Sequence, residues 1–173
     1  FAHALGVTTG VDPSPKMVEI AAGRNIETCV GSAEQLPFAE DSFEGVLMAF
    51  TLCFVADAPQ ALRECHRVLR PGGRLLLGMV PAGSPWGREY QEKAARGHPI
   101  YSHAHFRTAA DTIDLGEDAP FALCDTAGTL FWKPDQAAAQ EPQCKFQCGE
   151  EAGFLGILFQ NPGGEPESTL RKT

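Results

Sequence analysis

A carboxylate that directly follows a short β-branched run is the first feature of this sequence able to bind a ligand. Asp12 comes at the end of residues 7–11, and a helix with Ser14 as N-cap and Pro15 in its first turn is predicted to begin at once. In an open α/β sheet the carboxyl ends of strands lie where ligands bind, and a carboxylate there can accept hydrogen bonds from both hydroxyls of a ribose. A turn aspartate that only caps the helix explains the same pattern, so this segment alone leaves both roles open.

The elements that must position Asp12 alternate in the manner of a parallel α/β sheet. Strands are predicted at 7–11, 27–30, 43–50 and 74–80, with a helix after the first and another between the last two. Asp57 and Gln60 have the spacing of a capping box at the start of that second helix, and Pro71-Gly72-Gly73 is predicted to end it. The fold class is therefore α/β, a Rossmann-like three-layer sandwich with a mainly parallel sheet.

The second half of the chain is less regular. Helices are predicted at 86–96 and from a Thr108 cap to about Glu117, followed by strand pieces at 121–124 and 129–132, a polar loop at 134–148 and a last strand at 154–159. Residues 1–160 are predicted to form one domain. Residues 161–173 contain prolines, glycines and charges and are predicted to be a loose tail.

Composition limits the classes of partner. The formal net charge is −8, which argues against a nucleic-acid binder, since such proteins carry a basic stripe for the phosphates. No apolar run approaches the roughly 20 residues that cross a bilayer, so no membrane partner is expected. A small molecule is the expected substrate, and a cytoplasmic location is expected.

Cysteine usage agrees with that location. Cys144 and Cys148 are four residues apart in a polar stretch and could bind a metal or form a disulfide, but no second pair of ligands accompanies them at zinc spacing. No metal site is therefore predicted. The other cysteines fall inside predicted strands or helices and are expected to be reduced core residues: Cys29, Cys53, Cys65 and Cys124.

Histidines and aromatic residues gather between positions 86 and 106. The histidines lack a carboxylate at ligand spacing and are expected to lie in a pocket or on the surface: His98, His103 and His105. Trp86, Tyr90 and Phe106 either line a substrate pocket or form the core of this segment. No residue is assigned as a catalytic base.

Four motifs together resemble a known family. They occur in this order: Gly10-Val11-Asp12-x-Ser14-x-x-Met17, Gly31-x-Ala33-Glu34-x-Leu36-Pro37-Phe38, Ser42-Phe43-Glu44-x-Val46 and Arg67-Val68-Leu69-Arg70-Pro71-Gly72-Gly73. Through them the sequence resembles class I S-adenosylmethionine-dependent methyltransferases of the small-molecule type, over about residues 1–83. The resemblance implies that the last strands pair antiparallel at one edge of the sheet. It also implies S-adenosylmethionine as cofactor and methyl transfer to a small molecule as the activity.

The resemblance also implies roles for individual residues. Asp12 would bind the ribose hydroxyls of the cofactor. The remaining cofactor contacts would be Pro13 and Met17 beside the adenine, Ser32 and Ala33 at its edge, and Phe50 and Thr51 at the methionine part. Apolar walls with a few fixed polar contacts suit such a ligand.

The sequence departs from the family pattern in two places. Ser32 stands where the family usually has an aspartate, so its hydrogen bond would lack charge assistance. No Gly-x-Gly-x-Gly occurs before Gly10, and the family has that loop after its central first strand. The chain is therefore expected to be N-terminally truncated, with a gap between the strand before Asp12 and the strand before Phe50. As it stands, it is expected to bind the cofactor poorly.

Two alternatives remain open from the sequence. Asp12 at a strand end also fits the ribose of a nicotinamide cofactor in a Rossmann-like dehydrogenase, although the other motifs do not favour that class. The absent glycine loop favours a non-catalytic remnant.

Overall fold

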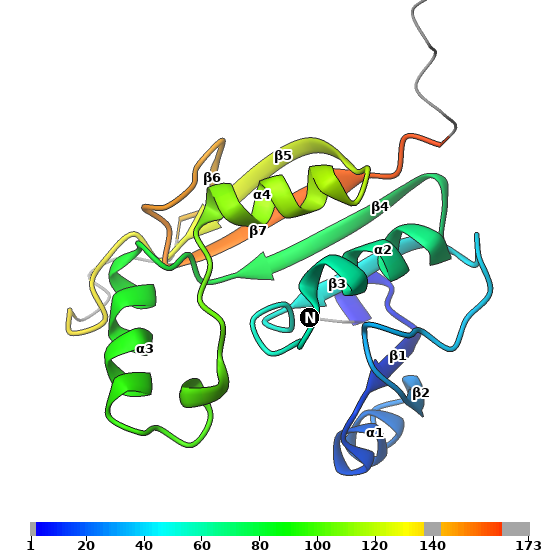
Figure 1. Ribbon diagram of the computed structural model, residues 1–173, viewed down its shortest axis with the longest axis horizontal. Helices are drawn as coiled ribbons and strands as arrows, with labels where there is room; N and C mark the ends of the chain where they lie inside the picture. The colour runs from blue at the N-terminus through cyan, green and yellow to red at the C-terminus, as the bar shows by residue number, and fades with distance from the viewer. Residues whose placement is uncertain (1–2, 137–142, 164–173) are drawn as a thin grey trace, which may run out of the picture.

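The strands of the protein form two separate sheets (Figure 1). The computed structural model describes residues 3–136 and 143–163. The smaller sheet pairs β1 (Thr9–Asp12) in parallel with β2 (Glu27–Val30), after the 3₁₀ turn η1 (His3–Leu5). Helix α1 (Pro15–Ala22) packs against both strands, yet none of its eight residues is buried.

The larger sheet has five strands in the order β3-β4-β7-β5-β6. The β3–β4 pair is parallel, and the three other pairs are antiparallel. These strands have the bounds β3 (Phe43–Ala49), β4 (Leu69–Met79), β5 (Ala122–Thr129), β6 (Lys145–Phe146) and β7 (Phe154–Gln160).

Two helices cover one face of the larger sheet and enclose the core. Helix α2 (Ala58–Val68) packs against β4, helix α4 (Ala109–Asp118) packs against β5 and β7, and the two helices contact each other. Between them and the sheet lie apolar side chains with no solvent exposure, which supply most of the driving force for folding: Leu62, Leu69, Leu75, Leu77, Leu155, Ile157 and Phe159.

A helical segment stands apart from this core, beyond the carboxyl end of β4 (Figure 1). It contains helix α3 (Pro85–Ala95) and the 3₁₀ turn η2 (Tyr101–His103), which contact each other. Ser84 begins α3 as its N-cap, and its hydroxyl accepts a hydrogen bond from the Gly87 N–H at 2.9 Å. Within the parts of the chain that the structure describes, no helix is both long and apolar enough to cross a membrane.

The predicted α/β class, the parallel pairs and the antiparallel C-terminal edge are confirmed. The Thr108–Asp111 capping box forms as predicted, and Asp57 accepts from the Gln60 N–H. The second half of the predicted Asp57–Gln60 box does not form, because the Gln60 side chain donates to the Glu34 carbonyl and the Asp57 N–H to the Glu34 carboxylate. The gap expected between β1 and β3 is present, since the two strands belong to different sheets.

Four predictions of detail differ from the structure. The pieces at 121–124 and 129–132 are wrong, since one strand, β5, runs through the polar residues 125–126, which pair with β7. The start of β4 at 74 is also wrong, because pairing with β3 already begins at Leu69. Antiparallel pairs outnumber parallel ones, three to two. In the described ranges helices cover only one face of the larger sheet, so the predicted third layer is missing there.

Candidate functional site

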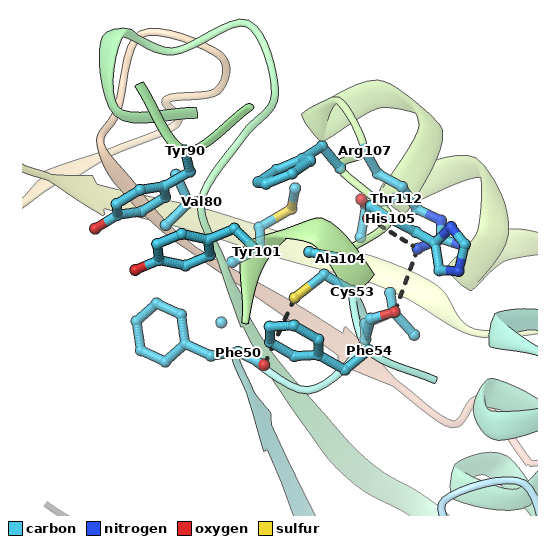
Figure 2. Close-up of a pocket in the computed structure, with 14 residues that line it drawn as sticks. Phe50, Cys53, Phe54, Val80, Tyr90, Tyr101, Ala104, His105, Arg107 and Thr112 are labelled. Atoms are coloured by element: carbon cyan, nitrogen blue, oxygen red, sulfur yellow. Dashed lines mark hydrogen bonds between the residues drawn. The ribbon is translucent and has the colours of Figure 1, made fainter. Parts of the chain in front are cut away.

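A cavity of about 270 Å³ lies at the carboxyl ends of β3 and β4 (Figure 2). Its floor comes from the residues that end β4, its side from the chain that follows β3, and its other walls from α3, η2, the chain after η2 and α4. The lining residues are Phe50, Leu52, Cys53, Phe54, Gly78, Met79, Val80, Tyr90, Tyr101, Ala104, His105, Phe106, Arg107 and Thr112.

Aromatic rings dominate the walls of the cavity. Tyr90 and Tyr101 stack with their ring centroids 4.6 Å apart, and His98 stacks on Tyr101 at 4.4 Å (Figure 2 shows the tyrosine pair). Phe50 has φ +57° and leaves 52% of its surface exposed, while its ring contacts Phe154 at 5.1 Å. The cavity therefore offers flat apolar surfaces, which suit a planar organic molecule.

The polar groups of the cavity are uncharged or already hydrogen-bonded. Arg107 donates to the carbonyl oxygens of Leu52 at 3.2 Å and His105 at 3.4 Å. Burial raises the pKa of the Cys53 thiol, so the thiol stays protonated near neutral pH. None of the described lining residues is Asp or Glu. The described lining therefore contains no carboxylate that could neutralise a cationic ligand.

The residues predicted to bind a cofactor lie at the end of β1, in the first turn of α1 and in the loops that follow β1, β2 and β3, and hydrogen bonds bring these loops together. The Gly31 N–H donates to the Asp12 carbonyl at 3.2 Å, which joins the first two loops. Glu34 joins the second loop to the third, because its carboxylate accepts from the Ala56 N–H at 2.9 Å and the Asp57 N–H at 3.4 Å.

The Asp12 carboxylate has a capping role in the structure. Its Oδ1 accepts from the Ser14 N–H at 2.8 Å, whereas the Ser14 side chain forms no capping bond to α1. This is the turn role left open by the sequence, and it occupies one of the two carboxylate oxygens. Val30, which pairs with Asp12, and Met17, in the first turn of α1, are 55% and 50% exposed, so apolar surface is exposed around the end of β1.

The other predicted residues divide into two groups. Phe50 alone lines the cavity, whereas Thr51 is exposed and its hydroxyl donates to the Ala49 carbonyl at 3.2 Å. The remaining residues lie around the ends of β1 and β2, Pro13 exposed, Ser32 half-buried, and Ala33 partly buried against the main core.

A second set of bonds fixes the 36–38 loop to helix α2. Arg67 contacts the Glu64 carboxylate through Nε at 2.6 Å and Nη2 at 2.7 Å, and it also donates to the carbonyls of Leu36 and Phe38. The Leu36 N–H donates to Glu64 at 2.8 Å. The Arg67 guanidinium holds the pKa of Glu64 below its usual value. The Leu36-Pro37-Phe38 and Arg67 motifs of the sequence thus have a structural basis.

We expect Glu64→Gln to lower the free energy of unfolding at pH 7 by about 1 kcal/mol, the scale of a well-aligned ion pair. Because the folded-state pKa of Glu64 is lowered, this stability is fully present above the ordinary carboxyl pKa of about 4.3 and is lost as pH falls through the folded-state value. Urea unfolding followed by tryptophan fluorescence between pH 3 and pH 7 measures the difference.

Glu44→Gln is the matched control, since Glu44 pairs with Arg70 at 3.4 Å on the open surface. Its effect should be near zero at every pH. A Glu64→Gln difference that stays constant down to pH 3 contradicts the assignment.

The structure places the aromatic and histidine side chains of residues 86–106 that the sequence left between a pocket and a core. Tyr90 and Phe106 line the cavity, whereas Trp86 donates from Nε1 to the Trp132 carbonyl at 2.8 Å and lies against Gly153. His105 also lines the cavity. Among the residues that the structure describes, no three His, Cys, Asp or Glu side chains gather in a metal-binding group. Sequence reasoning missed Tyr101 and Met79, whose positions depend on tertiary contacts. Its assignment of Cys53 and Cys124 to the core is wrong, since Cys53 is only partly buried and lines the cavity and Cys124 is exposed.

Comparisons with known proteins agree on one kind of domain. A family model described as a methyltransferase domain matches residues 1–77. A solved SAM-dependent methyltransferase of Thermotoga maritima is 35% identical with a TM-score of 0.85, covering 93% of this chain and 76% of its own.

Two curated relatives are longer than this chain. An uncharacterised protein of Mycobacterium tuberculosis is 38% identical over 96% of this chain, which spans 59% of that relative's length. A demethylmenaquinone methyltransferase of Mycolicibacterium paratuberculosis is 32% identical over 88% of this chain and 60% of its own length.

Proposed function

The chain belongs to the S-adenosylmethionine-dependent methyltransferases, and we propose that it transfers a methyl group from that cofactor to a small neutral organic acceptor held in the cavity. The observation that carries the proposal is the place of the cavity. Phe50, the residue directly after β3, lines the cavity. A hydrogen bond to Glu34 joins the loop after β3 to the loop after β2, where predicted cofactor contacts lie.

The residues around the ends of β1 and β2 fit the cofactor. Asp12 Oδ1 caps the turn, and the other oxygen of its carboxylate is available to the ribose hydroxyls. The exposed Met17 side chain, with Pro13, would pack on the adenine. Ser32 and Ala33 would border the edge of the adenine, and Phe50 and Thr51 would border the methionine part.

Methyl transfer requires little covalent chemistry from the protein itself. When bound, the cofactor supplies a methyl group on a sulfonium centre, which an acceptor atom attacks in line. The residues of this chain would orient the acceptor and exclude water, and positioning of this kind supplies much of the rate. Phe50 would lie between the two ligands, since it is both the first residue after β3 and part of the cavity wall.

The cavity favours a flat, uncharged acceptor. The ring faces of the Tyr90–Tyr101 pair and Phe50 suit a planar molecule, and no described lining residue carries a negative charge to pair with a cation. Because some relatives are demethylmenaquinone methyltransferases, demethylmenaquinone is the first acceptor to test.

Two measurements test the proposed function. Calorimetric titration with S-adenosylmethionine should give weak but saturable heat, and addition of NADH should not compete. Transfer of labelled methyl from the cofactor to demethylmenaquinone should follow when the quinone is supplied as its reduced quinol, whose ring carbon can attack the methyl group and then lose its proton. Competition by NADH, or no cofactor binding at all, contradicts the proposal, whereas binding without transfer to this quinone rejects the quinone alone.

A further inference from the structure

The cavity is closed on one side by a single segment, residues 84–107, which we name the pocket cover. It contains α3 and η2 and carries six of the lining residues: Tyr90, Tyr101, Ala104, His105, Phe106 and Arg107. Its two ends lie side by side, because the Ala82 N–H donates to the Arg107 carbonyl at 2.8 Å. The cover therefore leaves and rejoins the core at one place.

A single carboxylate accepts hydrogen bonds from the backbone just before and just after the pocket cover. Glu150, from the loop between β6 and β7, accepts from the Gly83 N–H through Oε1 and from the Ala109 N–H through Oε2, the latter at 2.8 Å. Gly83 directly precedes the cover, and Ala109 is the first residue of α4. A Cβ at Gly83 would lie 2.7 Å from Oε1, so glycine there permits the close approach.

The interior of the cover is held by its own contacts. Tyr101 stacks between Tyr90 and His98, and the His98 Nδ1 accepts from the Ile100 N–H at 3.2 Å. The His105 N–H also donates to the Cys53 carbonyl at 2.7 Å, which places the cover against the cavity. Loss of the two Glu150 hydrogen bonds should therefore move the pocket cover as a unit and leave its internal contacts in place.

We propose that Glu150 is a positioning residue, which sets the aromatic wall of the acceptor cavity by holding both ends of the pocket cover. The role in acceptor binding rests on the proposed function, whereas the role in holding the cover does not. Glu150 itself is absent from the cavity lining and acts through the backbone of Gly83 and Ala109.

Hydrogen exchange of the amides in the cover tests the structural role. Glu150→Gln retains one acceptor oxygen, so one of the two N–H groups loses its partner, and Glu150→Ala removes both acceptors. We expect exchange within residues 84–107 to quicken by about tenfold in Glu150→Gln, and by more in Glu150→Ala, while the amides of β4 and β7 keep their rates.

Two further variants keep this test decisive. Gly83→Ala forces the carboxylate away by steric contact and should quicken exchange in the same segment without removing the charge. Glu151→Gln is the matched control, since the exposed Glu151 accepts a local bond from the Gly149 N–H at 3.1 Å and no other among the described residues, and it should change nothing. Unaltered exchange in folded Glu150→Gln and Gly83→Ala proteins overturns the proposal.

Kinetics separate this inference from the proposed function. With demethylmenaquinone as acceptor, Glu150→Gln should raise the acceptor KM by about tenfold and leave the Kd for S-adenosylmethionine unchanged. If the unaltered protein neither binds the cofactor nor transfers methyl, the proposed function fails while the exchange result still decides the role of Glu150. If exchange quickens but acceptor KM stays the same in an active enzyme, Glu150 holds the cover without setting the cavity, and the proposal in its full form is rejected.

Discussion

Replacing Asp12 with alanine is expected to weaken S-adenosylmethionine binding by about tenfold to a hundredfold for each ribose hydroxyl that it binds, since a hydrogen bond to a charged group contributes about 1.5–3 kcal/mol. The reason is the free carboxylate oxygen at the end of β1, around which Met17 and Val30 expose apolar surface. Calorimetric titration of the variant against the unaltered chain measures the change in Kd.

Asp12→Asn separates ligand binding from the turn. The amide oxygen can still accept from the Ser14 N–H, whereas the amide nitrogen is a donor and cannot accept from a hydroxyl. A ribose role predicts that both variants lose affinity and that only Asp12→Ala loses stability. Unchanged affinity in both, with lower stability in Asp12→Ala, would mean that Asp12 is a cap and nothing more.

Filling the cavity is expected to have the largest effect on methyl transfer. Ala104 is a small residue in the aromatic wall, between η2 and His105, so Ala104→Trp would place an indole in the space proposed for the acceptor (Figure 2). We expect kcat/KM for demethylmenaquinone to fall by at least a hundredfold, which corresponds to about 2.7 kcal/mol of lost transition-state binding. Cofactor affinity should stay within twofold, because the substitution lies outside the predicted cofactor contacts.

Ala95→Trp is the matched control, since Ala95 is the exposed last residue of α3 and does not line the cavity. It should leave both kcat/KM and cofactor affinity unaltered. If Ala104→Trp retains full activity, the acceptor binds elsewhere.

Features that depend on neighbours in the sequence could be predicted from it. The Asp57 cap and the Thr108–Asp111 box need only residues three apart, and both form. The separation of β1 from β3 was expected from the family resemblance and the lack of a Gly-x-Gly-x-Gly motif before Gly10, and the two strands belong to different sheets. Continuity of β5 could not be predicted, because its polar middle residues are held in the strand by β7 and by the Thr126 hydroxyl on the Cys148 carbonyl.

The candidate site was less predictable because its walls are assembled from distant segments. Cys53 meets His105 through a backbone bond, and Glu150 reaches Gly83 from 67 residues away. Neither pairing leaves a pattern in the local sequence. The role of Phe50 came from the family resemblance, whereas that of Asp12 was also expected from its place at the end of a strand, and the structure adds the neighbours that make both roles testable.

The separation of the two sheets has a consequence for how the chain melts. No described residue of β1, β2 or α1 belongs to the buried core, so this part can open locally while the larger sheet stays folded, and a single two-state transition does not describe both. Trp86 donates to the Trp132 carbonyl and lies against Gly153, directly before β7, so neither tryptophan belongs to β1, β2 or α1 and their fluorescence should not report that opening. A cofactor held by Asp12 on one sheet and Phe50 beside the other would bridge the two units, and its binding free energy would be reduced by the cost of ordering the smaller one.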